Sequence, residues 1–302
     1  MPALAKRSAL PAPHDWASQL LDEGWCIIPG LMPAGKVRAL HGDLRERFER
    51  TPFCDGDFYG PRTKRFGGLL KRSRHAEAFV RHPLILDIAD RVLLPHCESY
   101  QLNLAQALEL HPGAPAQAPH RDQDMWRGPV GRIEYLINVM WPFTPYRAEN
   151  GATVVWPGSH RRQDEDSIDR SEAIAAEMEP GSALIFLGST LHGAGANRTL
   201  RPRTGMVVSY SLGWLKPYEN QWLVYPPHIA RGFSPELAAL VGYRQHRPNL
   251  GNYEGQCPSV LLDGEVPDYL GAVDALRPEQ RAALAQHAAG QSNEQQPNLS
   301  VI

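Results

Sequence analysis

The chain has few cysteines, almost no net charge and no long apolar run. Only four of its 302 residues are cysteines, namely Cys26, Cys54, Cys97 and Cys257, and none stands at the close spacing of a zinc or redox motif. Such scattered cysteines argue against a disulfide or zinc framework. We interpret them as reduced thiols of a cytoplasmic protein.

The low net charge and the short apolar runs exclude two further classes. The formal charge is −2 at pH 7, whereas nucleic-acid-binding proteins usually carry a basic excess. No apolar run approaches the ~18 residues of a membrane span. Lys6 and Arg7 are not followed by the apolar core of a signal peptide. We therefore expect no nucleic-acid partner and no membrane partner.

The rest of the composition is that of an ordinary globular protein, with 42% hydrophobic and 21% charged residues. We find no internal repeat and no domain-sized linker. The prediction is a loose N-terminal arm at 1–13, a single domain at 14–290 and a polar, disordered tail at 291–302.

The pattern of apolar residues predicts helices around a β-rich core. Helical spacing indicates helices at 15–23, 33–49, 84–94, 234–243 and 278–289. Short β-rich segments, punctuated by Gly, Pro and Asn, lie at 25–29, 99–110, 132–141, 152–156, 182–187 and 203–214. Short strands of this kind favour a sandwich or jelly roll, here with its core at about 99–214.

One motif carries most of the functional information: His120-Arg-Asp122, followed far downstream by His192. In an extended segment, residues i and i+2 project to the same side, so His120 and Asp122 can bind one metal while Arg121 points away. Two histidines and one carboxylate form the facial triad that holds iron(II) and leaves coordination positions open. The tripeptide alone is a weak signal, because a solvated loop would also contain it by chance.

Two other interpretations of short motifs are each excluded by one residue. A protein-kinase catalytic loop would need Asn five residues after Asp122, where Arg127 stands. Gly193-Ala-Gly195 resembles the start of a dinucleotide-binding loop, but Arg198 occupies the position of the third glycine. We expect His160, which follows a Pro-Gly-Ser turn, to be a surface residue.

Further polar residues strengthen the iron hypothesis. Arg203 stands eleven residues after His192, at the start of the next predicted strand, where a guanidinium can clamp a carboxylate. Gln117 precedes the first histidine by three residues, and Thr153 stands in a predicted strand. With the triad, and over about residues 16–221, this pattern resembles the phytanoyl-CoA dioxygenase family of iron(II)- and 2-oxoglutarate-dependent oxygenases.

The resemblance implies a double-stranded β-helix, a cupin-like jelly roll, with helices packed outside. It implies that His120, Asp122 and His192 hold iron(II), that 2-oxoglutarate takes two of the open positions and that O2 takes the third. Arg203 would then bind the distal carboxylate of 2-oxoglutarate, although Arg201 competes for this role because it lies on the same strand face.

The resemblance also implies roles for two neutral side chains and a class of reaction. Thr153 would add a hydroxyl at the distal carboxylate of 2-oxoglutarate, and Gln117 an amide near its metal-bound end. Both have structural alternatives, strand packing and a loop amide. Because Asp122 keeps the carboxylate that halogenating relatives lack, we expect hydroxylation or another C–H oxidation, with release of succinate and CO2. The substrate expected is a small organic molecule, such as a secondary metabolite. The alternative is a non-catalytic metal- or ligand-binding jelly roll, which would have no need of the Arg203 clamp.

Two segments stay open in their interpretation. The basic stretch 62–74 is either a solvated face or a source of charges that reach the cavity. The segment 215–290 is a helical extension that follows the last barrel strand. It carries aromatic residues, among them Trp222 and Tyr225, which either cover the mouth of the barrel, meet a second subunit in a homodimer or pack on the outer face of the barrel.

Overall fold

The computed structural model describes residues 13–164 and 168–294. The predicted arm lies outside the described residues except for Pro13, and so does the tail from residue 295. The last helix, α8 (Pro278–Glu294), is longer than expected and occupies the first four positions of the segment predicted to be disordered.

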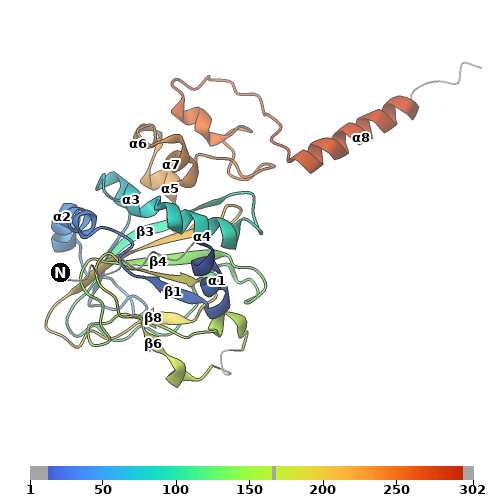
Figure 1. Cartoon of the computed structure of the whole chain (residues 1–302). Coiled ribbons are helices and arrows are strands. Elements are labelled where there is room, and N and C mark those ends of the chain that lie inside the picture. Colours follow the sequence, from blue (N-terminus) through green and yellow to red (C-terminus); the bar gives the residue numbers. More distant parts are fainter. Residues whose placement is uncertain (1–12, 165–167, 295–302) are drawn as a thin grey trace, which may run out of the picture.

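Two antiparallel sheets form the body of the molecule (Figure 1). The larger sheet has the order β1-β7-β4-β9-β3-β2, and the smaller has the order β6-β5-β8. The strands of the larger sheet are β1 (Trp25–Ile28), β2 (Thr63–Phe66), β3 (Tyr100–Leu110), β4 (Leu136–Pro142), β7 (Ala183–Leu187) and β9 (Arg203–Leu212). Those of the smaller sheet are β5 (Thr153–Val155), β6 (Ile174–Ala175) and β8 (His192–Ala194). The predicted cupin-like jelly roll is confirmed.

Helices cover one face of the larger sheet, as Figure 1 shows for α1 (Pro13–Glu23) and α4 (Pro83–Leu93). Ile85, Ile88 and Val92 stand at helical spacing on α4 and are buried. Removing each such side chain from water stabilises the fold by roughly 1.5–3 kcal/mol. The remaining α-helices are α2 (Ala34–Arg50), α3 (Glu77–Val80), α5 (Gln221–Val224), α6 (Pro227–Ala230) and α7 (Pro235–Leu240). Among the described residues, 3-10 helices lie at Leu69–Lys71, Asp122–Trp126, Ser159–Arg161, Arg170–Glu172 and Pro258–Leu262.

The other face of the larger sheet lines the interior of the jelly roll. A second apolar cluster there includes Leu108 and Leu110 of β3, Met140 of β4, and Leu184 and Phe186 of β7. Every residue of β4 is buried, because its alternate side chains face the helices and the jelly-roll interior. The larger sheet thus lies between two apolar clusters and packs against both.

The strand prediction was incomplete in three places. β2 lies within the basic stretch and has charged side chains at its two central positions, which hid it from a hydrophobicity pattern. β6 and β8 have two and three residues, too few for a period-2 signal.

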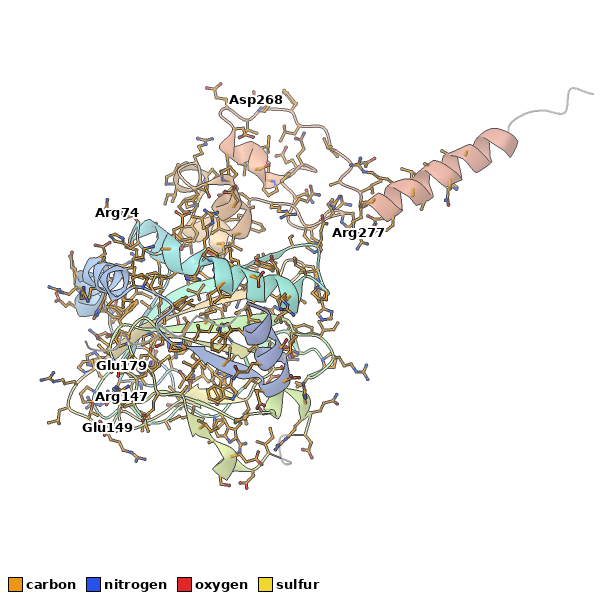
Figure 2. All side chains as sticks on the ribbon, viewed as in Figure 1. Arg74, Arg147, Glu149, Glu179, Asp268 and Arg277 are labelled. Atoms are coloured by element: carbon orange, nitrogen blue, oxygen red, sulfur yellow. The ribbon has the colours of Figure 1, made fainter. Side chains whose placement is uncertain are left out.

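Charged side chains cover the outside of the molecule, and the labelled Arg74, Asp268 and Arg277 point away from the body (Figure 2). The residues of the basic stretch 62–74 differ in exposure: Arg62, Lys71 and Arg74 are exposed, whereas Arg65 is partly buried. Within the described ranges, no helix has the length and apolar character to cross a membrane.

The aromatic residues after β9 do not share one role. Tyr225 is fully buried in the main core, and its main-chain and side-chain groups bind Tyr243 and the Leu70 amide. Trp222 is 45% exposed and donates to the Gly242 carbonyl. Neither lines the main cavity described below. Of the roles left open for this segment, packing on the outer face of the barrel applies to Tyr225, while Tyr218 of the same segment lines the cavity.

Truncation of these two side chains should therefore lower the free energy of unfolding by different amounts. Tyr225→Ala removes a fully buried aromatic ring and should lower the free energy of unfolding by about 3–5 kcal/mol. Trp222→Ala removes a half-exposed ring and should cost less than about 2 kcal/mol. Urea denaturation followed by circular dichroism measures both. Equal losses would contradict the assignment of Tyr225 to the core.

Candidate metal centre

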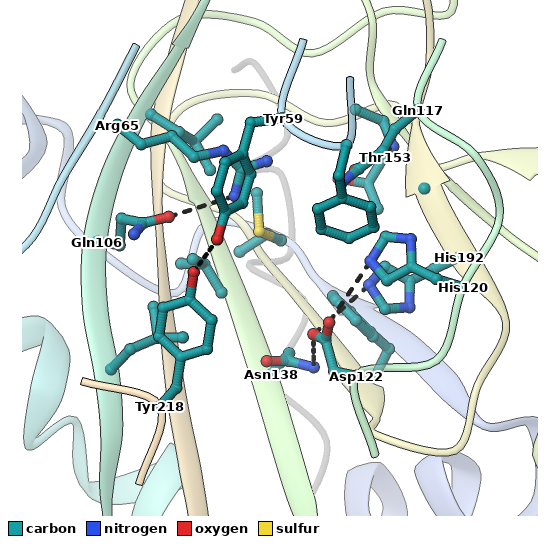
Figure 3. Close-up of a pocket in the computed structure, with 18 of the residues that line it drawn as sticks. Tyr59, Arg65, Gln106, Gln117, His120, Asp122, Asn138, Thr153, His192 and Tyr218 are labelled. Atoms are coloured by element: carbon teal, nitrogen blue, oxygen red, sulfur yellow. Dashed lines mark hydrogen bonds and ion pairs between the residues drawn. The ribbon is translucent and has the colours of Figure 1, made fainter. Parts of the chain in front are cut away.

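His120, Asp122 and His192 converge on one point between the two sheets (Figure 3). The His120 Nε2 lies 3.5 Å from Asp122 Oδ1, and the His192 Nε2 lies 3.6 Å from Asp122 Oδ2. One ligand atom from each residue lies within 4.8 Å of those of the other two. Within the described chain, no other group of three such side chains meets this criterion.

Backbone pairing sets this geometry. The His120 amide donates to the His192 carbonyl at 2.9 Å, and the His192 amide donates back at 3.0 Å. The second ring nitrogen of each histidine is held as well, since His120 Nδ1 lies 2.9 Å from the Ala118 carbonyl and His192 Nδ1 lies 3.0 Å from the Thr190 carbonyl. These carbonyls hold the proton on Nδ1, so that the lone pair of Nε2 faces the metal position.

The electrostatics favour the ligating protonation states. Burial would raise the pKa of Asp122, but the neighbouring His192 and His120 outweigh it and lower this pKa to about 2. Burial lowers the pKa of His192 to about 4. Burial would also lower the pKa of His120, but the hydrogen bond and charge of Asp122 raise it. At neutral pH, Asp122 is an anion and His192 a neutral imidazole, the forms that bind a metal ion.

Neighbouring side chains fix the ligands in place. Asn138 on β4 donates through Nδ2 to Asp122 Oδ2 at 3.0 Å. Phe58 packs edge-on against His120, with ring centroids 4.8 Å apart. Arg121 points away from the metal position as predicted, and its guanidinium donates to the Ser189 and Arg162 carbonyls.

The triad lies in the wall of a cavity of about 360 Å³, within the size range of small-molecule sites. The same cavity is lined by Arg203 at the start of β9, Thr153 on β5 and Gln117, all three predicted from the sequence. Gln117 is partly engaged, because its Oε1 accepts from the Ala194 amide at 3.3 Å. The larger sheet thus contributes Arg203, and the smaller contributes Thr153.

Arg203 is a buried cation with unused donors. It is 1% exposed, and its guanidinium carbon lies 4.2 Å from the centre of the Tyr146 ring. Nη2 donates to the carbonyl of Gly151, whose φ of 88° favours glycine. Nε and Nη1 have no hydrogen-bond partner among the described residues. Because an unsatisfied buried donor is costly, this group fits an anionic ligand that the cavity would hold.

Two other predictions for single residues have clear outcomes. Arg201, the competitor of Arg203, is exposed and does not line the cavity. His160 was predicted to lie on the surface, which is wrong, because it is 4% exposed and its Nε2 lies 3.1 Å from the Leu21 carbonyl. Helix α1, which contains Leu21 and is far from His160 in sequence, covers the turn that was expected to face solvent.

The sequence did not single out three residues that line the cavity. Arg65 comes from the basic stretch, Tyr59 from the turn before β2 and Tyr218 from the segment after β9. Arg65 donates through Nη1 to Gln106 Oε1 at 3.2 Å, and its Nε has no partner among the described residues. The basic stretch was noted as a source of charge, but its pattern did not distinguish Arg65 from its neighbours.

A jelly roll in which two histidines and a carboxylate face an open cavity has the fold and donor set of the non-haem iron oxygenases. The chain belongs to the phytanoyl-CoA dioxygenase (PhyH) family, whose model matches residues 20–205. The predicted family is thereby confirmed.

Curated relatives are dioxygenases of similar length. The multifunctional dioxygenase ausE of Aspergillus calidoustus is 31% identical over 264 residues, which cover 80% of this chain and 88% of the relative. The dioxygenase aneA of Aspergillus aculeatus is 30% identical over 253 residues, with coverages of 77% and 85%. These relatives and the family identify the chain as an enzyme, a dioxygenase that depends on iron(II) and 2-oxoglutarate.

Solved structures share the fold. The epimerase SnoN from nogalamycin biosynthesis, in complex with Fe3+, α-ketoglutarate and nogalamycin RO, aligns with a TM-score of 0.55 at 20% identity. The alignment covers 67% of this chain and 84% of SnoN. HygX from Streptomyces hygroscopicus, with nickel and 2-oxoglutarate bound, gives a TM-score of 0.54 at 15% identity, with coverages of 72% and 91%.

The geometry predicts how iron binding responds to substitution. Asp122→Ala should abolish stoichiometric iron(II) binding, because it removes the anionic ligand. Asn138→Ala should weaken binding about 10- to 100-fold, as loss of a partner of a ligand usually does. Anaerobic iron(II) titration measures both. Asp124→Ala, two residues from Asp122 and outside the triad, is the control and should bind iron(II) normally. Undiminished iron binding by Asp122→Ala would refute the triad.

Proposed function

We propose that this enzyme hydroxylates, or otherwise oxidises at a C–H bond, a small natural product, with His120, Asp122 and His192 as the iron ligands. Two lines of support concern the substrate. The curated relatives are fungal dioxygenases of similar length, and the aligned structures include enzymes captured with nogalamycin RO and with hygromycin B. Both of these ligands are small organic molecules, and the cavity lies within the size range of small-molecule sites.

One observation carries the assignment: the two unused donors of Arg203 lie in the same cavity as the triad. A metal site with a structural role would need no buried guanidinium facing its cavity. A bidentate carboxylate would satisfy both donors and the charge of Arg203. This observation favours the oxygenase over a non-catalytic metal- or ligand-binding jelly roll.

The two ends of 2-oxoglutarate meet different side chains in this proposal. Arg203 binds the distal carboxylate, and Thr153, which is buried beside the same cavity, donates its hydroxyl there. Arg65 faces the metal-bound end, because its charge acts on both Asp122 and His192 and its Nε is unused. Gln117 contributes the remaining amide at that end.

Bound iron supplies the activation of O2 that is coupled to conversion of 2-oxoglutarate into succinate and CO2. The residues of the chain bind and orient. Apolar side chains around Arg203, among them Leu108, Leu110 and Met140, exclude water from the distal carboxylate, which strengthens its pairing with the guanidinium. We further propose a cytoplasmic location and, through the exposed segment after β9, a homodimer.

A screen of small molecules, read as 2-oxoglutarate-dependent succinate formation in the iron(II)-loaded protein, tests the reaction. Natural-product extracts and intermediates of the neighbouring pathway are the inputs. A true substrate should raise succinate formation above the substrate-free rate and gain one oxygen atom or lose two hydrogens in the mass spectrum. Failure of the iron(II) protein to convert any 2-oxoglutarate would contradict the proposal.

Substitution of the two competing arginines tests the clamp. Arg203→Ala should weaken 2-oxoglutarate binding by about 2–5 kcal/mol, because a buried carboxylate loses its charged partner. Arg201→Ala, the matched control, should change it by less than about 0.5 kcal/mol, since the side chain is exposed. Anaerobic calorimetric titration of 2-oxoglutarate into the iron(II) protein measures both. The reverse order would assign the clamp to Arg201.

A further inference from the structure

The cavity has a buried end and an open end. Arg203 and Thr153 are 1% and 5% exposed, whereas Tyr218, Met125 and Phe58 are 44%, 44% and 51% exposed. In the proposed function, 2-oxoglutarate fills the buried end between Arg203 and the metal. The substrate is therefore left with the open end, which these three exposed side chains and Tyr59 line.

Two tyrosine hydroxyls meet at this open end. The hydroxyl of Tyr59, from the turn before β2, contacts the hydroxyl of Tyr218, from the segment after β9. Figure 3 shows the pair on the side of the cavity opposite the metal triad. Two phenols carry two donors, and their mutual hydrogen bond uses one of them. Neither hydroxyl has another hydrogen-bond partner within the described ranges, so one O–H remains to donate.

Contacts with neighbouring residues hold both tyrosines in position. The Tyr218 amide donates to Asn103 Oδ1 at 2.7 Å, and the next amide, of Glu219, donates to the Asn103 carbonyl at 3.0 Å. Glu219 Oε1 in turn accepts from the Gly68 amide at 3.1 Å, which ties this segment to the loop after β2. The Tyr59 ring lies over the Arg65 guanidinium, 4.9 Å from its carbon. The hydroxyl pair is thus positioned before any ligand binds.

The charges that line the cavity do not favour an anionic substrate at the open end. Arg203 and Arg65 are used by 2-oxoglutarate in the proposed function, which leaves neither of them to pair with an anionic substrate. Burial and the neighbouring Tyr59 raise the pKa of Tyr218, so its phenol stays neutral and keeps its proton. The ring of Phe58 and the side chain of Met125 add apolar walls beside this neutral donor.

We propose that Tyr59 and Tyr218 are specificity-determining residues that donate a hydrogen bond to a carbonyl or other acceptor oxygen of an uncharged, largely apolar substrate. This inference rests on the proposed function, because the assignment of the buried end to 2-oxoglutarate leaves the open end to the substrate. The donated bond would fix which face of the substrate is turned toward the metal. Tyr59 also links the two ligands, since its ring covers the cation at the metal-bound end of 2-oxoglutarate.

The test compares two probes that differ in one oxygen: cyclohexyl phenyl ketone and its hydrocarbon counterpart benzylcyclohexane. Each is titrated into the anaerobic protein loaded with iron(II) and 2-oxoglutarate, and its dissociation constant is read from the change in the visible absorption of that complex. The quantity compared between variants is the ratio of the hydrocarbon constant to the ketone constant, which cancels general apolar binding.

The double variant Tyr59→Phe and Tyr218→Phe keeps both rings and removes both hydroxyls. We expect it to lower this ratio about fivefold to tenfold, the effect of one neutral hydrogen bond, and to leave the 2-oxoglutarate absorption intact. Tyr253→Phe, at an exposed tyrosine outside the cavity lining, is the control and should keep the wild-type ratio.

A ratio within twofold of wild type in the double variant would overturn the inference, and so would a wild-type protein whose absorption responds to neither probe. Loss of the visible absorption in the double variant would also overturn it, by placing the tyrosines at 2-oxoglutarate. A wild-type protein that shows no such absorption would instead refute the proposed function.

Discussion

The site depends on one pair of backbone hydrogen bonds, in which His120 and His192 exchange amide and carbonyl at 2.9 and 3.0 Å. The pairing is local in space but joins residues far apart in sequence. It sets the two imidazoles on one side of the small sheet with their ring centroids 4.4 Å apart. Asp122 then needs only the two-residue repeat of an extended chain to reach the same point. The ligand geometry is therefore built on main-chain groups, which side-chain substitutions nearby leave in place.

The two sheets of the jelly roll supply the other polar residues of the site. His192 and Thr153 come from the small sheet, with Val155 of β5 in register with His192 of β8. Asn138, Gln106 and Arg203 come from the large sheet, where Arg203 is paired with Leu110 at the end of β3. Because α1 and α4 bury the outer face of the large sheet, its inner face can carry polar groups without loss of the main core. The separation of the two apolar clusters is what permits a buried guanidinium in the middle of the protein.

The sequence predicted the parts of this site that depend on short repeats. The i, i+2 spacing of His120 and Asp122, the helical stripe of α4 and the position of Arg203 at a strand start are local patterns. Arg65, Tyr59 and Tyr218 could not be found in this way, because their place in the cavity depends on how the β2 turn and the segment after β9 meet across the sheet edge. The same long-range packing buries Tyr225, which the sequence could not distinguish from the exposed Trp222. In that segment, aromatic residues stand both at the surface and in the core, so residue type alone does not distinguish a buried position from an exposed one.

The residues around the cavity divide it by charge. Arg203 lies at the buried end and Arg65 lines the same cavity, whereas the open end has two phenols, the ring of Phe58 and the side chain of Met125. In the proposed function, a dicarboxylate passes the mouth and reaches the depth of the cavity, where its pairing with Arg203 is shielded from water. The proposed function then implies that the oxoacid binds first and the substrate second.

The most direct test of this account is the visible spectrum of the anaerobic iron(II) protein during titration with 2-oxoglutarate. Chelation of iron by the 2-oxo-carboxylate end should produce a metal-to-ligand absorption that saturates at one 2-oxoglutarate per chain, while succinate, which lacks the 2-oxo group, should produce none. A spectrum that 2-oxoglutarate leaves unchanged, in a protein that has bound iron(II), would contradict the claim that the triad and Arg203 together form one site for metal and oxoacid.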